Sequence, residues 1–242
     1  MINQDKRDNI SGLTSFCKLN IHFNSMKILI AILFAGATLS LSAEPYVGIR
    51  LQGTFSTLKP VGGNAGTVQA FNAHKKYYLG PQVGISIFTR IGKYFGFAPE
   101  VNFMMKGLKY DDGGSSRLRR YIQAEVPMLF KAGYGKEHFF IYATGGGYAT
   151  VDVTIQDITK PSDGGKQKTR VYFSEVPDQR FDAGIATGGG AMWIGKKGVL
   201  DLAFRYNIGM MKHYKEKELE AGQPNTKWRS FGVSLAYMWK GK

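Results

Sequence analysis

The chain has 242 residues, enough for one or two domains, and carries a formal net charge of +14. It contains 31 Gly, 13 Tyr and 16 Phe against one Cys, a composition typical of β-barrels that excludes a disulfide framework. The basic balance favours anionic partners, such as nucleic acid or lipid phosphate; its other explanation is dispersed surface charge that aids solubility.

The first pattern in chain order is that of a secretory signal peptide. Lys27 supplies the positive charge, Ile28 to Leu39 the apolar region, and Leu41-Ser42-Ala43 a cleavage site of small residues. A membrane-spanning helix needs about 20 apolar residues, more than this run provides, so an anchor is disfavoured. We therefore expect this segment to direct export.

This interpretation divides the chain into three parts. Residues 1–25 are an over-called start or an extended n-region, residues 26–43 are the signal peptide, and residues 44–242 are the exported domain. The only cysteine, Cys17, precedes the signal peptide, so the exported chain is expected to have no disulfide and no thiol chemistry.

The exported part contains eight segments in which apolar residues recur at every second position. Alternation over this length predicts strands, because successive side chains of a strand point to opposite faces of the sheet. No helical period is evident after residue 43. The predicted strands are Tyr46–Thr57, Tyr78–Ile91, Phe97–Tyr110, Tyr121–Ala132, Phe139–Val153, Phe181–Ile194, Val199–Met211 and Trp228–Trp239.

The links between these strands alternate in length. Long or moderate links follow the odd strands (Leu58–Tyr77, for example), and tight links such as Gly92-Lys93 follow the even strands. Transmembrane barrels with an up-and-down topology have long outer loops, short periplasmic turns and an even strand count. The fold class predicted is therefore all-β, an eight-stranded antiparallel up-and-down transmembrane β-barrel.

The two faces of the strands indicate which solvent each one meets. One face is almost uniformly apolar, whereas the other mixes charged residues with Gly, Ala and Ser. A basic side chain facing lipid near the midplane costs about 2–4 kcal/mol, so the mixed face is expected to point inward. Aromatic residues near strand ends are expected to form interfacial girdles: Tyr46, Tyr78, Phe95, Tyr121, Trp193, Trp228 and Trp239.

Five of these segments resemble, in order and spacing, the PorT-type family of small eight-stranded outer-membrane β-barrels. The runs that carry the resemblance are FAPEVNFMMKGLKY, YIQAEVPMLFK, FFIYATGGGYA, FDAGIATGGGAMW and LDLAFRYNIGM, within a stretch from about Tyr46 to Trp239. The resemblance implies an outer-membrane location and, through the family's namesake, a link to a secretion apparatus. Such barrels usually end on an aromatic residue that the assembly machinery recognises. This sequence differs, because Lys240-Gly241-Lys242 follows the aromatic Trp239.

The candidate site is a lumen charge network on the inward face. Acids and bases at mid-strand favour a satisfied polar core that fills a narrow interior and holds strand register. A proton path, an ion path or a gated pore is the functional alternative. The residues of the lumen charge network are Arg50, Glu100, Lys106, Glu125, Lys131, Asp201 and Arg205.

Other motifs weigh against catalysis and cofactors. Neither Gly145-Gly146-Gly147 nor Gly188-Gly189-Gly190 precedes a helix, so neither is a phosphate loop. The histidines His74, His138 and His213 lack ligand spacing, so we expect no metal and no cofactor. A hydrolase at the barrel rim, with His213 beside a Ser or an acid, is a minor alternative.

The expected function is therefore non-enzymatic: a monomeric barrel that is structural or binds a partner or ligand through its outer loops. An accessory subunit of a secretion or envelope-assembly machine is the alternative. Lipid, including anionic headgroups, and envelope proteins are the expected partners; the export signal excludes nucleic acid. The basic loop residues are Lys59, Lys75, Lys76, Arg117, Arg119, Arg120, Lys166, Lys168, Arg170, Lys212 and Lys215.

Overall fold

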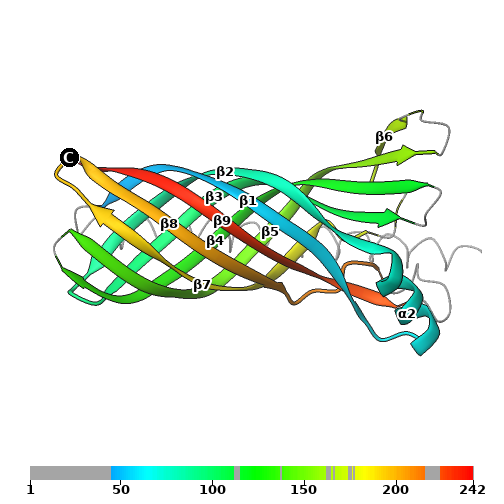
Figure 1. Cartoon of the computed structure of the whole chain (residues 1–242), viewed down its shortest axis with the longest axis horizontal. Coiled ribbons are helices and arrows are strands. Elements are labelled where there is room, and N and C mark those ends of the chain that lie inside the picture. Colours follow the sequence, from blue (N-terminus) through cyan, green and yellow to red (C-terminus); the bar gives the residue numbers. More distant parts are fainter. Residues whose placement is uncertain are drawn as a thin grey trace, which may run out of the picture. The chain divides into compact units, whose positions relative to one another are not determined.

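The structure, a computed structural model, describes residues 45–111, 115–136, 138–161, 165, 167–173, 176, 178–215 and 224–241. The expected signal peptide over 26–43 and the segment 1–25 lie outside the described residues. The elements, shown in Figure 1, are β1 (Tyr46–Val61), α2 (Ala65–His74), β2 (Lys75–Ile91), β3 (Phe95–Asp111), β4 (Ser116–Lys136), β5 (Phe139–Lys160), β6 (Gln167–Val171), β7 (Phe181–Ile194), β8 (Gly198–Gly209) and β9 (Asn225–Lys240).

Eight of these strands close into a ring. The order around it is β1, β2, β3, β4, β5, β7, β8 and β9, and every pair is antiparallel. β9 returns to β1 and closes the ring, pairing from Lys240 opposite Tyr46 to Asn225 opposite Val61. The predicted up-and-down barrel is confirmed, and closure gives each ring strand a partner on both sides.

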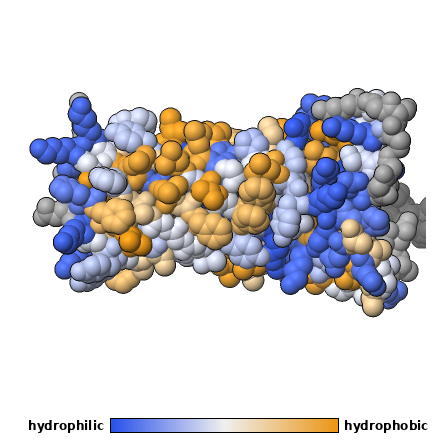
Figure 2. Space-filling model, in the orientation of Figure 1, coloured by the Kyte–Doolittle hydropathy of each residue, from blue (hydrophilic) through white to orange (hydrophobic). Residues whose placement is uncertain are grey.

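The predicted facing of the strands is also confirmed. Ile85, Phe103 and Leu235 on the apolar face are 56%, 57% and 51% exposed, whereas Arg50 and Asp201 on the mixed face are wholly buried. Figure 2 shows an apolar band around the visible face of the barrel wall, between two hydrophilic ends. An apolar outer surface around a polar interior is the arrangement of a barrel that spans a lipid bilayer.

The glycine run of β5 keeps an unbroken register. Gly145, Gly146 and Gly147 pair continuously with Phe130, Leu129 and Met128 of β4, without a bulge. A Cβ atom on Gly146 would clash with the carbonyl oxygen of Met128. Gly146 therefore permits the close approach of β5 to β4.

Two elements differ from the sequence prediction. α2 lies in the expected loop Leu58–Tyr77, and β6 lies in the expected loop Thr154–Arg180. The sequence of α2 carries no apolar stripe that would predict a helix, and none of its residues is buried. β6 pairs only with β5, where β5 extends past its pairing with β7. None of the described helices is long and apolar enough to cross a membrane.

The girdle prediction is wrong for Tyr46, Tyr121 and Trp228. Tyr46 is partly buried and packs against the apolar cluster inside the barrel, with its ring beside that of Phe88. Tyr121 and Trp228 are 1% and 2% exposed and pack with one another inside the barrel, at the end with the long loops. Phe95, Trp193 and Trp239 lie on the outer surface as predicted, each at least half exposed. Strand facing explains the error, because Tyr121 and Trp228 fall at inward positions of β4 and β9.

Candidate functional site: the barrel interior

The interior of the barrel is layered along its axis. At the end with the short turns an apolar cluster fills it, including Phe88, Leu129, Phe140, Met192 and Met238. At the end with the long loops a second cluster contains Leu58, Tyr121, Ile155, Val176 and Trp228. All seven residues of the lumen charge network are at most 4% exposed.

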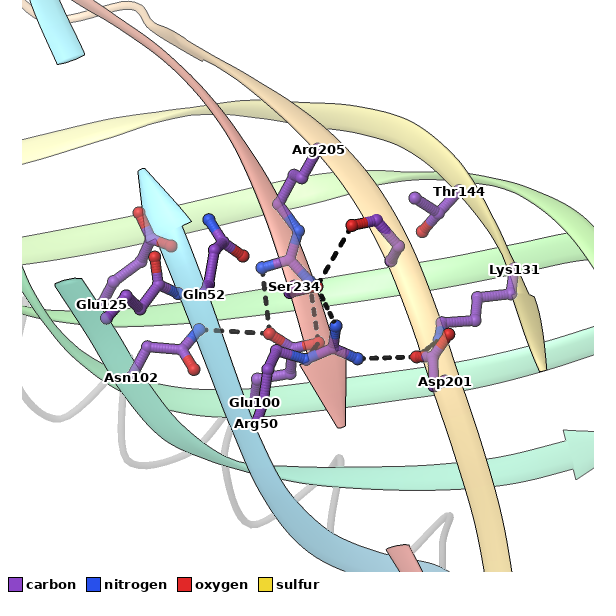
Figure 3. A network of polar contacts seen from close by, with 12 residues as sticks. Arg50, Gln52, Glu100, Asn102, Glu125, Lys131, Thr144, Asp201, Arg205 and Ser234 are labelled. Atoms are coloured by element: carbon purple, nitrogen blue, oxygen red, sulfur yellow. Dashed lines mark hydrogen bonds and ion pairs between the residues drawn. The ribbon is translucent and has the colours of Figure 1, made fainter. Parts of the chain in front are cut away.

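Arg50 is the centre of the lumen charge network, and Figure 3 shows its contacts. It projects from β1 between an acid of β3 and an acid of β8: Nε lies 3.1 Å from Oε1 of Glu100, and Nη2 lies 2.8 Å from Oδ2 of Asp201. Nη1 donates a 2.6 Å hydrogen bond to Oγ of Ser234. A single guanidinium therefore links its own strand β1 to β3, β8 and β9.

The two acids beside Arg50 each bind a second cation. Arg205 binds Glu100 through both carboxylate oxygens, with hydrogen bonds of 2.8 and 2.9 Å. Lys131 donates a 2.8 Å hydrogen bond to Asp201, whose other oxygen accepts a 2.6 Å bond from the hydroxyl of Tyr142. Charge-assisted and bidentate bonds of this kind are the strongest that side chains make.

The remaining pair lies closer to the long loops. Nζ of Lys106 lies 3.6 Å from Oε2 of Glu125, which also accepts a 3.3 Å hydrogen bond from Asn207. The structure thus brings five of the predicted residues into one connected group, Arg50, Glu100, Lys131, Asp201 and Arg205, and places Lys106 and Glu125 beside it as a separate ion pair.

A second polar cluster, which the sequence does not predict, lies at the long-loop end; we call it the rim cluster, made of Arg119, Tyr121, Asp157, Asp178 and His213. Tyr121 donates a 2.7 Å hydrogen bond to Asp178, and its hydroxyl lies 3.1 Å from Nε2 of His213. Arg119 binds Asp157 through bonds of 2.7 and 2.8 Å and Asp178 through one of 3.3 Å. Arg119, predicted from the sequence as one of the basic loop residues, lies in β4 and pairs with these two acids.

His213 is enclosed by aromatic rings. Its ring centroid lies 5.2 Å from Tyr121, 5.1 Å from Trp228 and 4.8 Å from Tyr214. Burial lowers the pKa of His213 to about 4; Asp178 opposes this shift and Arg119 adds to it. The imidazole is therefore neutral near pH 7.

The contacts that the described residues make with His213 do not pair its ring with a Ser or an acid at hydrogen-bond distance. Its Nε2 lies 4.0 Å from Asp178, beyond hydrogen-bond distance, and the side-chain hydrogen bond described for it goes to a tyrosine. Among the described residues, no group of three or more His, Cys, Asp or Glu side chains is arranged to hold a metal ion.

Comparison with known proteins finds likeness in fold but no family assignment. No protein-family model matches the chain, and no curated protein matches it. Solved structures similar to this chain include the attachment invasion locus protein Ail of Yersinia pestis, which is 11% identical with a TM-score of 0.36 over 81% of this chain and 99% of that one.

Two further outer-membrane structures are similar to the chain. Neisserial surface protein A is 14% identical, with a TM-score of 0.40 over 81% of this chain and 96% of that one. OprG from Pseudomonas aeruginosa is 10% identical, with a TM-score of 0.45 over 82% of this chain and 96% of that one. Because these TM-scores lie below 0.5, the assignment of the fold rests on the strand pairing of the chain itself.

Proposed function

We propose that this chain is a PorT-type outer-membrane β-barrel, exported through its signal peptide, with a closed lumen and a non-enzymatic role carried by its outer loops. The observation that carries the closed lumen is the lumen charge network between two apolar clusters. Arg50 contacts both Glu100 and Asp201 inside the barrel, and Arg205 of β8 binds Glu100 of β3 on the opposite side of the ring. Cross-barrel bonds between wholly buried side chains leave little room for a water-filled path.

Electrical recording tests the closed lumen. The barrel, refolded in detergent and inserted into planar bilayers, is expected to show no stable conductance, because ions would have to displace buried ion pairs. A steady ohmic conductance that shifts in ion selectivity in a Glu100→Gln variant would favour the pore instead. The matched control is Lys196→Gln, in the short turn between β7 and β8, which leaves the interior unchanged.

A role in partner binding is supported by the extension of β5 and β6 beyond the ring. The exposed strand β6 carries Lys168 and Arg170, and its pairing with β5 leaves its other edge without a described strand partner. Such an edge accepts a further strand from another chain. An accessory subunit of an envelope or secretion machine would present such a surface.

Site-specific crosslinking separates partner binding from a purely structural role. A photo-reactive amino acid at Thr169 in β6 is expected to capture a specific protein in cells that express the chain, whereas the same group at Lys196, at the opposite end of the barrel, is not. Recovery of lipid alone from Thr169 would count against the accessory-subunit function.

A further inference from the structure

A pocket opens on the outer surface of the barrel wall, where β1, β2 and β9 meet α2. It has a volume of about 390 Å³, and we call it the outer-rim pocket; the residues used below are Lys59, Asn72, Lys75, Tyr77, Tyr206 and Arg229. Strand alternation places it outside the barrel: Leu58 and Ser230 face the interior and are buried, so Lys59 and Arg229 beside them face outward.

The charge of the outer-rim pocket is one-sided. Lys59, Lys75 and Arg229 come from three different strands, and among the described residues that line the pocket none is acidic. Positive charges that crowd together in this way favour an anion that neutralises them.

Two of the three cations are held in position by the backbone. Arg229 donates hydrogen bonds of 2.8 and 2.7 Å to the carbonyl oxygens of Gly209 and Trp228, and Lys75 donates one of 3.3 Å to the carbonyl oxygen of Leu58. Carbonyl oxygens orient these side chains but carry no full charge. Each cation has further N–H groups available to a ligand.

The pocket is continuous with the apolar surface of the barrel. Phe55 and Phe231 stack at 4.9 Å between ring centroids, and Tyr77, which lines the pocket, meets Phe231 edge-on at 5.9 Å. Leu79, the next outward residue after Tyr77, is 57% exposed. A ligand with an anionic head in the pocket would therefore have its apolar part beside these side chains.

We propose that the outer-rim pocket binds the phosphate group of a membrane lipid, through Lys59, Lys75 and Arg229, while the acyl chains of that lipid lie along Phe55, Phe231 and Leu79. The proposal rests on the proposed membrane location of the barrel. Phosphate suits the site because it accepts several charge-assisted hydrogen bonds at once, and guanidinium and ammonium groups are its usual protein partners.

Native mass spectrometry of the refolded barrel in detergent micelles tests this assignment. Micelles doped with phosphatidic acid, which has a phosphomonoester head, are compared with micelles doped with phosphatidylcholine. The barrel is expected to retain phosphatidic acid in preference. A Lys59→Gln substitution should weaken retention about fivefold, the effect of one basic residue at a lipid surface, and Lys59→Arg should restore it.

The matched control is Lys93→Gln, which removes the same charge in the turn between β2 and β3, where the Lys93 ammonium lies 5.3 Å from the ring centroid of Tyr94. This variant should retain phosphatidic acid as the unmodified chain does. Equal losses in the two variants would reduce the effect to general charge attraction and overturn the proposal. Retention of inorganic phosphate alone, with the same dependence on Lys59, would overturn the lipid as its source.

The state of the barrel is checked in the same samples. A heat-modifiable shift on a gel shows that the barrel is folded, so a folded barrel without lipid preference refutes only the outer-rim pocket. Failure of all variants to fold in detergent would instead refute the transmembrane barrel on which the proposal rests.

Discussion

Asp201 is the residue on which two buried cations depend. Its carboxylate binds Arg50 and Lys131 and accepts a hydrogen bond from Tyr142. An isolated charge in an apolar interior is costly, so Asp201 stabilises both cations there, as the sole acid bound to Lys131 among the described ion pairs and as the second acid, with Glu100, beside Arg50. The lumen charge network thus stabilises the barrel only while each buried cation keeps an acid partner.

Removal of Asp201 tests this dependence. Asp201→Ala is expected to lower the free energy of unfolding by about 3–5 kcal/mol, because it leaves Arg50 and Lys131 short of a counter-charge. Urea unfolding of the refolded barrel in micelles measures the change. Lys196→Ala, an exposed charge in a short turn, should change it by less than about 0.5 kcal/mol. A loss for Asp201→Ala as small as that of Lys196→Ala would contradict the dependence.

His213 makes the rim cluster sensitive to pH. Its pKa is lowered to about 4 in the folded chain, against about 6.5 in an unfolded one. The unfolded chain therefore binds more protons between these values, and stability present above pH 6.5 is lost as the pH falls toward 4. The groups around the imidazole are Asp178, Arg119, Tyr121 and Tyr214.

We expect the free energy of unfolding to fall by about 2 kcal/mol between pH 7 and pH 5 through His213. In a His213→Asn variant, which has no titrating ring, that part of the pH dependence should disappear even though the variant is less stable at pH 7. Urea unfolding at the two pH values measures it. An unchanged pH dependence in the variant would show that His213 does not titrate as its burial requires.

At the scale of elements, neighbouring residues of β5 face either the barrel interior or its outer surface. Gly146 points inward and is crowded by the backbone of β4, whereas Gly145 points outward and a Cβ there would meet nothing within 4 Å. Successive residues of one run thus face different constraints, since alternate side chains of a strand lie on opposite sides.

The two glycines predict opposite results for the same substitution. Gly146→Val should reduce the folded fraction severely, because the new side chain would meet the carbonyl oxygen of Met128. Gly145→Val should be tolerated, since it adds an apolar side chain to the outer surface. The heat-modifiable gel shift after refolding gives the folded fraction. Similar folded fractions in the two variants would mean that the strand facing described for β5 is wrong.

At the scale of the whole molecule, the apolar outer surface is what adapts the barrel to lipid. Leu51 on β1 pairs with Leu235 on β9 and is 59% exposed. In water, so many exposed apolar side chains would drive aggregation, whereas in a bilayer they meet acyl chains. The hydrophilic ends in Figure 2 would then contact headgroups and water.

A charge on this surface should reveal its solvent. Leu51→Lys is expected to lower the free energy of unfolding by about 2–4 kcal/mol when the barrel is refolded into phospholipid vesicles. Thr169→Lys, on the exposed strand β6, adds the same charge outside the ring and should have almost no effect. Equal effects of the two substitutions would argue against insertion of the wall into lipid.

Local patterns in the sequence are enough to predict the barrel. Alternation in runs such as Phe97–Tyr110 assigns strand and facing, because the period of two is a property of each strand alone. The contrast between long and tight links predicts the up-and-down topology. The inward position of charged residues such as Glu100 and Arg205 follows from the same alternation.

Only the tertiary structure decides which charges meet. Arg50 contacts Glu100 and Asp201, residues 50 and 151 positions away, and the curvature of the closed wall, not sequence spacing, brings them together. The rim cluster forms for the same reason, since Tyr121, Asp178 and His213 come from three separate parts of the chain. Neither α2 nor β6 carries an alternating or amphipathic pattern of its own, so local sequence does not predict them; β6 forms through its pairing with β5.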